Sequence, residues 1–374
     1  MKPLSMVDLK SQYQKIKPEI DTAIQNVIDS CQFIKGDEVK LFEKDLAQYL
    51  NVNHAITCGN GTDALQIALM ALGLKPGDEV ITTTFTFIAT VEVIALLGLT
   101  PVLVDVDNDS FNIDVNQIKQ AITAKTKAII PVHLFGQCAN MEQIMEIANE
   151  HQLYVVEDTA QALGADYKFS NGTTQKAGTI GTIGCTSFFP SKNLGCYGDG
   201  GALFTNNPAI AEQIRCIANH GMKIRYHHDM IGVNSRLDSI QAAILRVKLR
   251  MLDSYNQARQ TAAKQYNTAF ANIMDIITPS TKEFTSHIYH QYTLRIKNGK
   301  RDALKKHLDE LQIPNMIYYP IPLHKQKAFE PYVSNKQTFC VSDSLCNEVL
   351  SLPMHTELDS EQINFITSSI QKFF

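Results

Sequence analysis

The sequence lacks the features that mark membrane-spanning, secreted and nucleic-acid-binding proteins. No apolar run approaches the roughly 18 residues that span a bilayer, and the N-terminus has no apolar signal core. The net charge is −4, and no long basic block is present. The eight cysteines are scattered without CxxC pairs. We therefore expect a cytoplasmic protein with no membrane contact, no nucleic-acid partner and no metal site.

What remains is an ordinary globular composition with a regular order of elements. The 374 residues are 44% hydrophobic and 19% charged, which suits two domains. Strand-like runs at 77–85, 98–107, 127–136 and 153–161 alternate with helical patterns at 63–73, from Asp114 onward and at 140–150, after an amphipathic helix over 13–30. This alternation predicts an α/β fold with a largely parallel sheet.

The pattern changes after residue 253. A long amphipathic helix beginning near Asp238 is followed by helices and strands in mixed order, including a strand at 290–296. We expect a large domain over 1–253 and a small α+β domain over 254–374. Two helices are expected to begin with reciprocal caps, because Asp114 and Asp238 are each followed three residues later by glutamine.

Lys192 is the most informative single residue. It lies between an apolar, strand-like run and a glycine-rich loop, in SFFPSKNLGCYGDGG. Apolar neighbours can desolvate the amine and lower its pKa, which makes the neutral nucleophile available. Schiff-base chemistry with an aldehyde or a pyridoxal-phosphate-type cofactor needs such an amine. The alternative is a solvated lysine beside a tight turn.

Other candidate residues lie at strand ends and helix starts. Gly61 and Thr62 precede a helix whose free N–H groups would suit an anion, although such turns are common. Asp158 ends an apolar strand, where a carboxylate either caps or pairs locally, or holds the pyridinium nitrogen of a cofactor. Gln161 follows within reach of the same ligand.

Aromatic and basic residues leave similar choices open. Phe85 and Phe87 alternate with threonines, so one could cover a flat ring, or both could belong to the core. Asn234 and Arg236 precede the long helix. Arg236 is either solvated or a bidentate partner for a carboxylate or phosphate.

Taken together, the motifs closely resemble the DegT/DnrJ/EryC1/StrS family of pyridoxal phosphate (PLP)-dependent nucleotide-sugar aminotransferases. The resemblance runs from about Leu9 to about Leu358 and rests on GNGTDALQIAL, TFTFIATVEVIALLG, VEDTAQALGA, SFFPSKN with GDGGALFTN, and GVNSRLDSIQAAIL. It implies a fold-type-I aminotransferase and a homodimer with active sites shared between subunits.

The resemblance also implies roles for individual residues. Lys192 would be the Schiff-base lysine and proton shuttle, Asp158 the partner of the pyridinium nitrogen, and Gln161 that of the ring hydroxyl. Phe87 matches the ring-stacking position. The phosphate would be held by Gly61, Thr62 and Ser187, joined by Asn234 of the partner subunit.

Several stretches resemble the branch that aminates C3 of UDP-linked keto-sugars, with glutamate as donor, for surface polysaccharides such as lipopolysaccharide O-antigen. The matching pieces include YYPIPLHKQ and SLPMH, and the substrate residues would be Arg236, Tyr318, Tyr319 and His324. Tyr318 stands where this branch often has histidine, and Lys35 and Asp37 stand where relatives often have leucine and proline. Alternatives are a dTDP-linked 3-keto or a 4-keto 6-deoxyhexose as substrate, a PLP-dependent dehydratase, and a regulatory relative without turnover.

Overall fold

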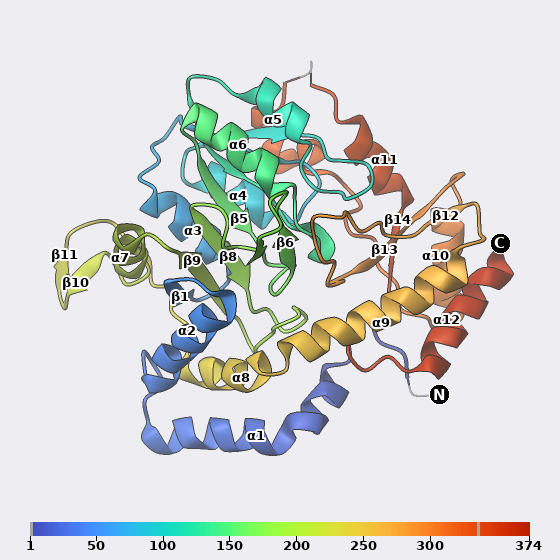
Figure 1. Cartoon of the computed structure of the whole chain (residues 1–374), viewed down its shortest axis with the longest axis horizontal. Coiled ribbons are helices and arrows are strands. Elements are labelled where there is room, and N and C mark those ends of the chain that lie inside the picture. The colour runs from blue at the N-terminus through green and yellow to red at the C-terminus, as the bar shows by residue number, and fades with distance from the viewer. Residues whose placement is uncertain (1–2, 335–336) are drawn as a thin grey trace.

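The computed structural model describes residues 3–334 and 337–374, and its centre is a seven-stranded sheet (Figure 1). The strand order is β1-β9-β8-β5-β4-β2-β3. β9 is antiparallel to both neighbours, and every other pair is parallel. The expected α/β class with a mostly parallel central sheet is thereby confirmed. The strands are β1 (His54–Cys58), β2 (Glu79–Thr83), β3 (Thr100–Val104), β4 (Thr126–Ile130), β5 (Tyr154–Asp158), β8 (Ile183–Ser187) and β9 (Gly201–Thr205).

Helices cover both faces of this sheet, as the alternation of side chains along a single strand shows. Ala128 and Ile130 of β4 pack in one apolar cluster with α3, α4 and α7, whereas Ile129 between them packs with α5 and α6. Successive side chains of a strand point to opposite faces, so both faces of β4 are buried. The helices are α3 (Gly61–Ala71), α4 (Ala89–Leu96), α5 (Val115–Ala121), α6 (Met141–His151) and α7 (Pro208–Ile217).

Three further helices pack beside β1 and β9. α2 (Asp37–Leu50) and α8 (Ser239–Leu249) share a cluster that includes Phe42, Phe188 and Phe204, and α1 (Leu9–Ser30) packs against α8. Asp8 begins α1, because its carboxylate accepts from the backbone N–H of Ser11 at 2.9 Å. These helices support the strand β9 and the loop that precedes it.

The C-terminal part has its own small sheet and its own core. β12 (Ile276–Ile277), β13 (Tyr292–Ile296) and β14 (Val349–Leu352) are antiparallel, and α9 (Leu252–Phe270), α10 (Arg301–Glu310) and α12 (Ser360–Phe373) pack with them. α9 runs from the end of α8 to this core (Figure 1). Leu252 at its start belongs to the cluster of α2 and α8, and Phe270 at its end to that of β13. We retain a domain boundary at 253/254 as a proposal.

Short elements complete the described chain. They are the hairpins β6 (Asp166–Lys168) with β7 (Thr174–Lys176) and β10 (Met222–Ile224) with β11 (His227–His228), the helix α11 (Cys340–Glu348), and the 3-10 turns η1 (Leu134–Gly136), η2 (Leu323–Lys325) and η3 (Lys327–Tyr332). Within residues 3–334 and 337–374, no helix is long and apolar enough to cross a membrane.

The two expected reciprocal caps do not form. Asp114 does cap α5, but the amide oxygen of Gln117 accepts from the backbone N–H of Asp105 at 2.8 Å. The amide oxygen of Gln241 accepts from the backbone N–H of Tyr197 at 2.8 Å, and the Asp238 side chain makes no capping bond. In both places a tertiary contact takes the glutamine that a local rule assigned to the helix start.

Candidate active site

A cavity of about 860 Å³ lies at the carboxyl ends of β5 and β8. This size suits a cofactor together with part of a substrate. Ligands of open α/β sheets collect at this edge, as the sequence pattern predicted. The cavity collects nine of the predicted site residues: Gly61, Thr62, Phe87, Asp158, Gln161, Ser187, Lys192, Tyr318 and Tyr319.

Lys192 enters the cavity from the loop between β8 and β9. Burial lowers the pKa of Lys192 to about 8, against the opposing influence of the nearby Asp158 carboxylate, which raises it. A lysine with this pKa keeps a substantial fraction of neutral amine at neutral pH. The side chain therefore has the property that a nucleophile or proton carrier requires.

The loop that carries Lys192 is held from several sides. The Asn193 amide donates to the amide oxygen of Asn256 on α9 at 2.7 Å. The ammonium group of Lys248, almost wholly buried on α8, donates to the carbonyl of Gly195. Burial also lowers the pKa of Lys248 to about 8. These contacts hold the chain that directly follows Lys192 against α8 and α9.

Asp158 lies at the end of β5 and is only 7% exposed. One carboxylate oxygen accepts from the Thr90 hydroxyl at 2.9 Å, and the other from the backbone N–H of Ala160 at 3.1 Å. Burial raises the pKa of Asp158 above its usual range, while these hydrogen bonds and Lys192 act in the opposite direction. The carboxylate is thus held rigidly in a site where a cationic partner would be strongly favoured.

The start of α3 approaches β8 closely enough to require glycine. A Cβ added at Gly61 would lie 2.7 Å from the Cβ of Ser187. Asn60 caps the helix by accepting from the backbone N–H of Asp63 at 2.8 Å. The N–H groups of Gly61 and Thr62, at the first positions of α3, have no partner within the helix. They lie beside the Ser187 hydroxyl at the cavity, which makes an anion cradle.

The two phenylalanines of TFTF have different environments. Phe85 is fully buried among Phe111, Phe135 and Tyr319, whereas Phe87 is 55% exposed and lines the cavity. Only Phe87 is therefore free to cover a ring. A partly buried hydrogen-bonded group also lines the cavity: the Gln161 amide accepts from the backbone N–H of Phe135 at 2.7 Å and donates to the Tyr319 hydroxyl at 3.1 Å.

Three predicted residues do not line this cavity. Asn234 is exposed, and Arg236 lines a separate hollow with Lys35 and Arg215. His324 is enclosed: one ring nitrogen lies 2.8 Å from the Thr84 hydroxyl, and the other 3.1 Å from a carboxylate oxygen of Asp343. Both ring nitrogens of His324 are engaged in structural contacts, so the single chain offers it no access to a ligand in the cavity.

The sequence interpretation missed several lining or supporting residues. Thr90 holds Asp158 from α4, and a polar residue at a buried position of an apolar helical run was the available signal. Phe189, 52% exposed beside Lys192, also lines the cavity, as do His290 and Gln291 from the C-terminal part. The last two carry no local sequence signal, because tertiary packing alone brings them to the sheet edge.

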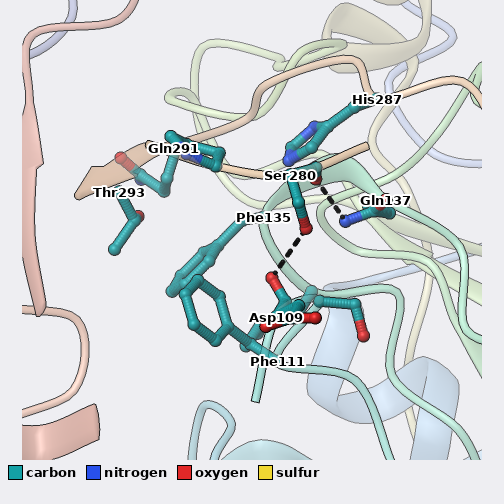
Figure 2. Close-up of a pocket in the computed structure, with 11 residues that line it drawn as sticks. Asp109, Phe111, Phe135, Gln137, Ser280, His287, Gln291 and Thr293 are labelled. Carbon is teal, nitrogen blue, oxygen red and sulfur yellow. Dashed lines mark hydrogen bonds between the residues drawn. The ribbon is translucent and has the colours of Figure 1, made fainter. Parts of the chain in front are cut away.

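A second, much smaller hollow lies behind the cavity and shares Phe135 and Gln291 with it. Figure 2 shows the ring of Phe135 beside that of Phe111, and the hydrogen bonds through which Ser280 joins Gln137 to Asp109. Its volume of about 10 Å³ is at most that of one water molecule. This hollow is a packing gap, and the ligand chemistry belongs to the larger cavity.

A lysine of lowered pKa, a buried aspartate and an anion cradle at the end of an α/β sheet define a fold-type-I, PLP-dependent type of enzyme. The chain belongs to the DegT/DnrJ/EryC1/StrS aminotransferase family, whose sequence profile matches residues 14–371. It is an enzyme of the sugar aminotransferase type, and its cofactor is PLP.

The similar proteins span nearly the whole chain. The chain is 47% identical over 371 residues to a "pleiotropic regulatory protein" of Geobacillus stearothermophilus, covering 99% of this chain and 98% of the other. It is 45% identical over 367 residues to the UDP-2-acetamido-2-deoxy-3-oxo-D-glucuronate aminotransferase of Pseudomonas aeruginosa, covering 98% and 99%. It is also 45% identical over 370 residues to a UDP-N-acetyl-3-dehydro-alpha-D-glucosamine 3-aminotransferase of Acidithiobacillus ferrooxidans, covering 99% and 97%.

Solved structures agree with this placement. A DegT DnrJ EryC1 StrS aminotransferase from Brucella abortus superposes with a TM-score of 0.94 at 41% identity, covering 99% of each chain. NtdA from Bacillus subtilis, solved with bound cofactor PMP, gives a TM-score of 0.89 at 29% identity, covering 98% of this chain and 82% of the other.

The residues of this structure fit PLP. The close approach of Gly61 to Ser187 leaves a cradle that a Cβ would fill, next to N–H and hydroxyl donors suited to a phosphate. The buried Asp158 suits a protonated ring nitrogen, and Lys192 supplies an amine of lowered pKa. Cradle, carboxylate and amine all line one cavity.

Proposed function

We propose that this sugar aminotransferase moves an amino group from L-glutamate to C3 of a UDP-linked 2-acetamido-2-deoxy-3-oxo sugar, either a hexuronate or a hexose. The product would serve surface polysaccharide biosynthesis. The proposal is carried by one cavity that unites Lys192, Asp158 and the Gly61 cradle. It is supported by 45% identity to two relatives named for UDP-linked 3-oxo sugars.

We assign the chemistry to three groups. When bound, PLP supplies a ring that withdraws electrons from the carbon that loses its proton. The Lys192 amine takes that proton and returns it, which its pKa of about 8 permits near neutral pH. Asp158 keeps the ring nitrogen protonated, and the Thr90 hydroxyl and the Ala160 N–H hold its carboxylate in place.

The remaining roles concern positioning. Gly61, Thr62 and Ser187 hold the phosphate at the start of α3, and Phe87 covers one ring face. Gln161 meets the ring hydroxyl through the side-chain amide N–H that is not donated to Tyr319. Tyr318 and Tyr319 line the part of the cavity left for the sugar.

We also propose a homodimer with shared sites. Asn234 is exposed and lies outside the cavity of its own chain, as a residue serving a second subunit would. Nearby, the β10–β11 hairpin projects from the body of the chain, and Ile224, Tyr226 and Ile231 in and beside it are 67%, 75% and 86% exposed (Figure 1). Apolar side chains grouped on a projecting segment are typical of an interface.

The amino acceptor is tested by the reverse reaction, whose first half-reaction consumes the aminosugar. PLP-loaded enzyme is given aminosugar nucleotides that differ in nucleotide (UDP or dTDP), in the aminated carbon (C3 or C4) and in C6 oxidation, with 2-oxoglutarate as acceptor. We expect glutamate to form fastest from the UDP-linked 3-amino sugars. Preference for a dTDP-linked or a 4-amino sugar would refute the substrate assignment, and Lys192→Ala is the inactive control.

The shared site is tested by complementation. Lys192→Ala and Asn234→Ala chains, each inactive alone, should recover activity after subunit exchange, because one site of each mixed dimer regains both groups. No recovery after exchange verified by mass spectrometry would refute the assignment of Asn234 to the partner's site.

A further inference from the structure

A separate cavity of about 240 Å³, whose lining residues differ from those of the two cavities described above, lies behind the start of α3. It is formed where α2, β1 and α7 meet the loop before α8, and its charged lining residues are Lys35, Lys40, Glu43, Arg215 and Arg236. Four cations and one carboxylate thus face one hollow. None of these five residues has a role in the chemistry proposed above, and the family resemblance names only Arg236 among them, as a substrate residue.

The carboxylate of this cavity is already engaged. Glu43 accepts from the backbone N–H of Thr57 at 2.9 Å and from the Arg215 guanidinium at 2.8 Å. Lys40 pairs with Asp37 at 2.9 Å. Within residues 3–334 and 337–374, neither Lys35 nor Arg236 forms an ion pair or a side-chain hydrogen bond. Two cations in this cavity therefore have no ion-pair partner of their own, although the Glu43 carboxylate lies near enough to act on Lys35.

These two cations affect each other. The pKa of Lys35 is lowered, first by burial and then by the positive charges of Arg236 and Arg215, with Glu43 acting in the opposite direction. Because Glu43 already accepts from Arg215, Lys35 and Arg236 still repel each other, and an arriving anion would lower that cost. Such an arrangement is a candidate binding site.

The backbone holds the two residues in place. The segment before α2 is pinned to the start of α8, because the Ser239 N–H donates to the Phe33 carbonyl at 2.9 Å and the Gly36 N–H donates to the Ser239 hydroxyl at 3.2 Å. The Ser235 hydroxyl accepts from the Gly59 N–H at 2.8 Å and donates to Asp63 at 2.6 Å. The cations are thus presented from two anchored segments.

We propose that Lys35 and Arg236 form a subsite for an anionic group of the nucleotide-linked substrate, either the sugar carboxylate or a phosphate. The inference rests on the proposed function. Because Arg236 lies two residues after Asn234, which we assign to the partner's site, the substrate in question is the one bound in the cavity of the partner subunit. Lys35 is then a residue that determines which sugar nucleotides bind.

The test is calorimetric binding to the PLP-loaded enzyme of three probes: UDP-2-acetamido-2-deoxyglucuronate, UDP-N-acetylglucosamine and UDP. Lys35→Met should weaken binding of at least the uronate about tenfold, the loss of one charged hydrogen bond. Lys44→Met, an exposed lysine on α2 that does not line the cavity, is the control and should bind like wild type.

The probes separate the two sources of the anion. A loss confined to the uronate identifies the sugar carboxylate, and an equal loss for all three probes identifies the diphosphate; either result supports the subsite. In the Lys35→Met/Arg236→Met double variant, a loss smaller than the product of the single losses is expected, since both groups would hold one anion. Equal binding of all probes by Lys35→Met, Lys44→Met and wild type would overturn the proposal.

The subsite and the proposed function can fail separately. If wild type converts a UDP-linked 3-amino sugar in the reverse reaction while Lys35→Met binds all three probes normally, only the subsite is wrong. If wild type binds none of the probes and consumes no UDP-linked sugar, the proposed function is wrong and the subsite falls with it.

Discussion

The titration of Lys192 gives a quantitative prediction for the protein stripped of its cofactor. With a pKa of about 8, the amine is about one-quarter neutral at pH 7.5, whereas an ordinary lysine is about one part in a thousand neutral. Trinitrophenylation of Lys192 at pH 7.5 should therefore be on the order of 100-fold faster than that of exposed lysines. The assay is trinitrophenylation against pH, with the labelled residue assigned by peptide mass spectrometry.

The carboxylate of Asp158 determines how a substitution at this position should change the pKa of Lys192. Because its charge raises the pKa of Lys192, Asp158→Asn should lower that pKa below 8. A fall of about one unit would raise the neutral fraction at pH 7.5 about threefold. Asp199→Asn removes a carboxylate that also lines the cavity but is not among the groups acting on Lys192, so its titration should match wild type.

Lys248 is an internal control for access. Its pKa is also about 8, but its ammonium group is buried and bonded to the Gly195 carbonyl, so it should resist the reagent. A Lys192 amine that titrates near 10.5, or a titration unchanged by Asp158→Asn, would refute the reasoning about burial and charge at this site.

Three further predictions concern the cradle and the buried titratable groups. Gly61→Ala should weaken PLP binding at least about tenfold in an absorbance titration, because the added Cβ would lie 2.7 Å from the Cβ of Ser187. Gly73→Ala is the control, because its φ is +69° and its added Cβ would meet open space. This variant should cost stability and leave PLP affinity unchanged. The pKa of the buried Lys248 is lower in the folded protein than in the unfolded chain, so its charge costs folding stability until the pH rises far enough to remove it. As the pH rises from 8 to 10.5, wild type should therefore gain up to about 3 kcal/mol of stability relative to Lys248→Met. A stability difference that is constant with pH in urea unfolding would contradict this. Burial lowers the pKa of His287 to about 3, so the contribution of the neutral imidazole to folding stability is present above pH 6.5 and is lost as the pH falls below it. Between pH 7 and 4, His287→Asn should therefore lose about 3 kcal/mol less folding stability than wild type. Equal losses of stability would count against a neutral buried imidazole.

The sheet was predictable because its strands carry their own signal. The run 153–161 opens with four consecutive apolar residues, as a strand buried on both faces does, and β5 (Tyr154–Asp158) lies within that run. The helix expected from Asp238 onward was predicted less well. Its apolar spacing continues past residue 249, but the structure ends α8 at Leu249 and begins α9 at Leu252. Periodicity reports a buried face and does not show where the backbone bends.

Parts of the site depend on contacts that no local pattern encodes. Phe85 and Phe87 are equivalent in sequence, and only the packing of Phe111 and Phe135 around Phe85 decides that Phe87 faces the cavity. His290 reaches the cavity through the docking of the C-terminal part. A complete reciprocal cap forms at Asp359 and Gln362, where the Gln362 amide oxygen stays on the Asp359 N–H while its amide nitrogen donates to the Pro3 carbonyl at 3.3 Å.

The most direct test of the account is borohydride reduction of the PLP-reconstituted protein, followed by peptide mapping. Reduction should leave a phosphopyridoxyl group on the peptide that contains Lys192, with loss of the visible absorbance band, and Lys192→Ala should remain unlabelled. Label on Lys248, the other lysine of lowered pKa beside this loop, or on no lysine at all, would contradict the assignment of Lys192 as the residue that binds the cofactor.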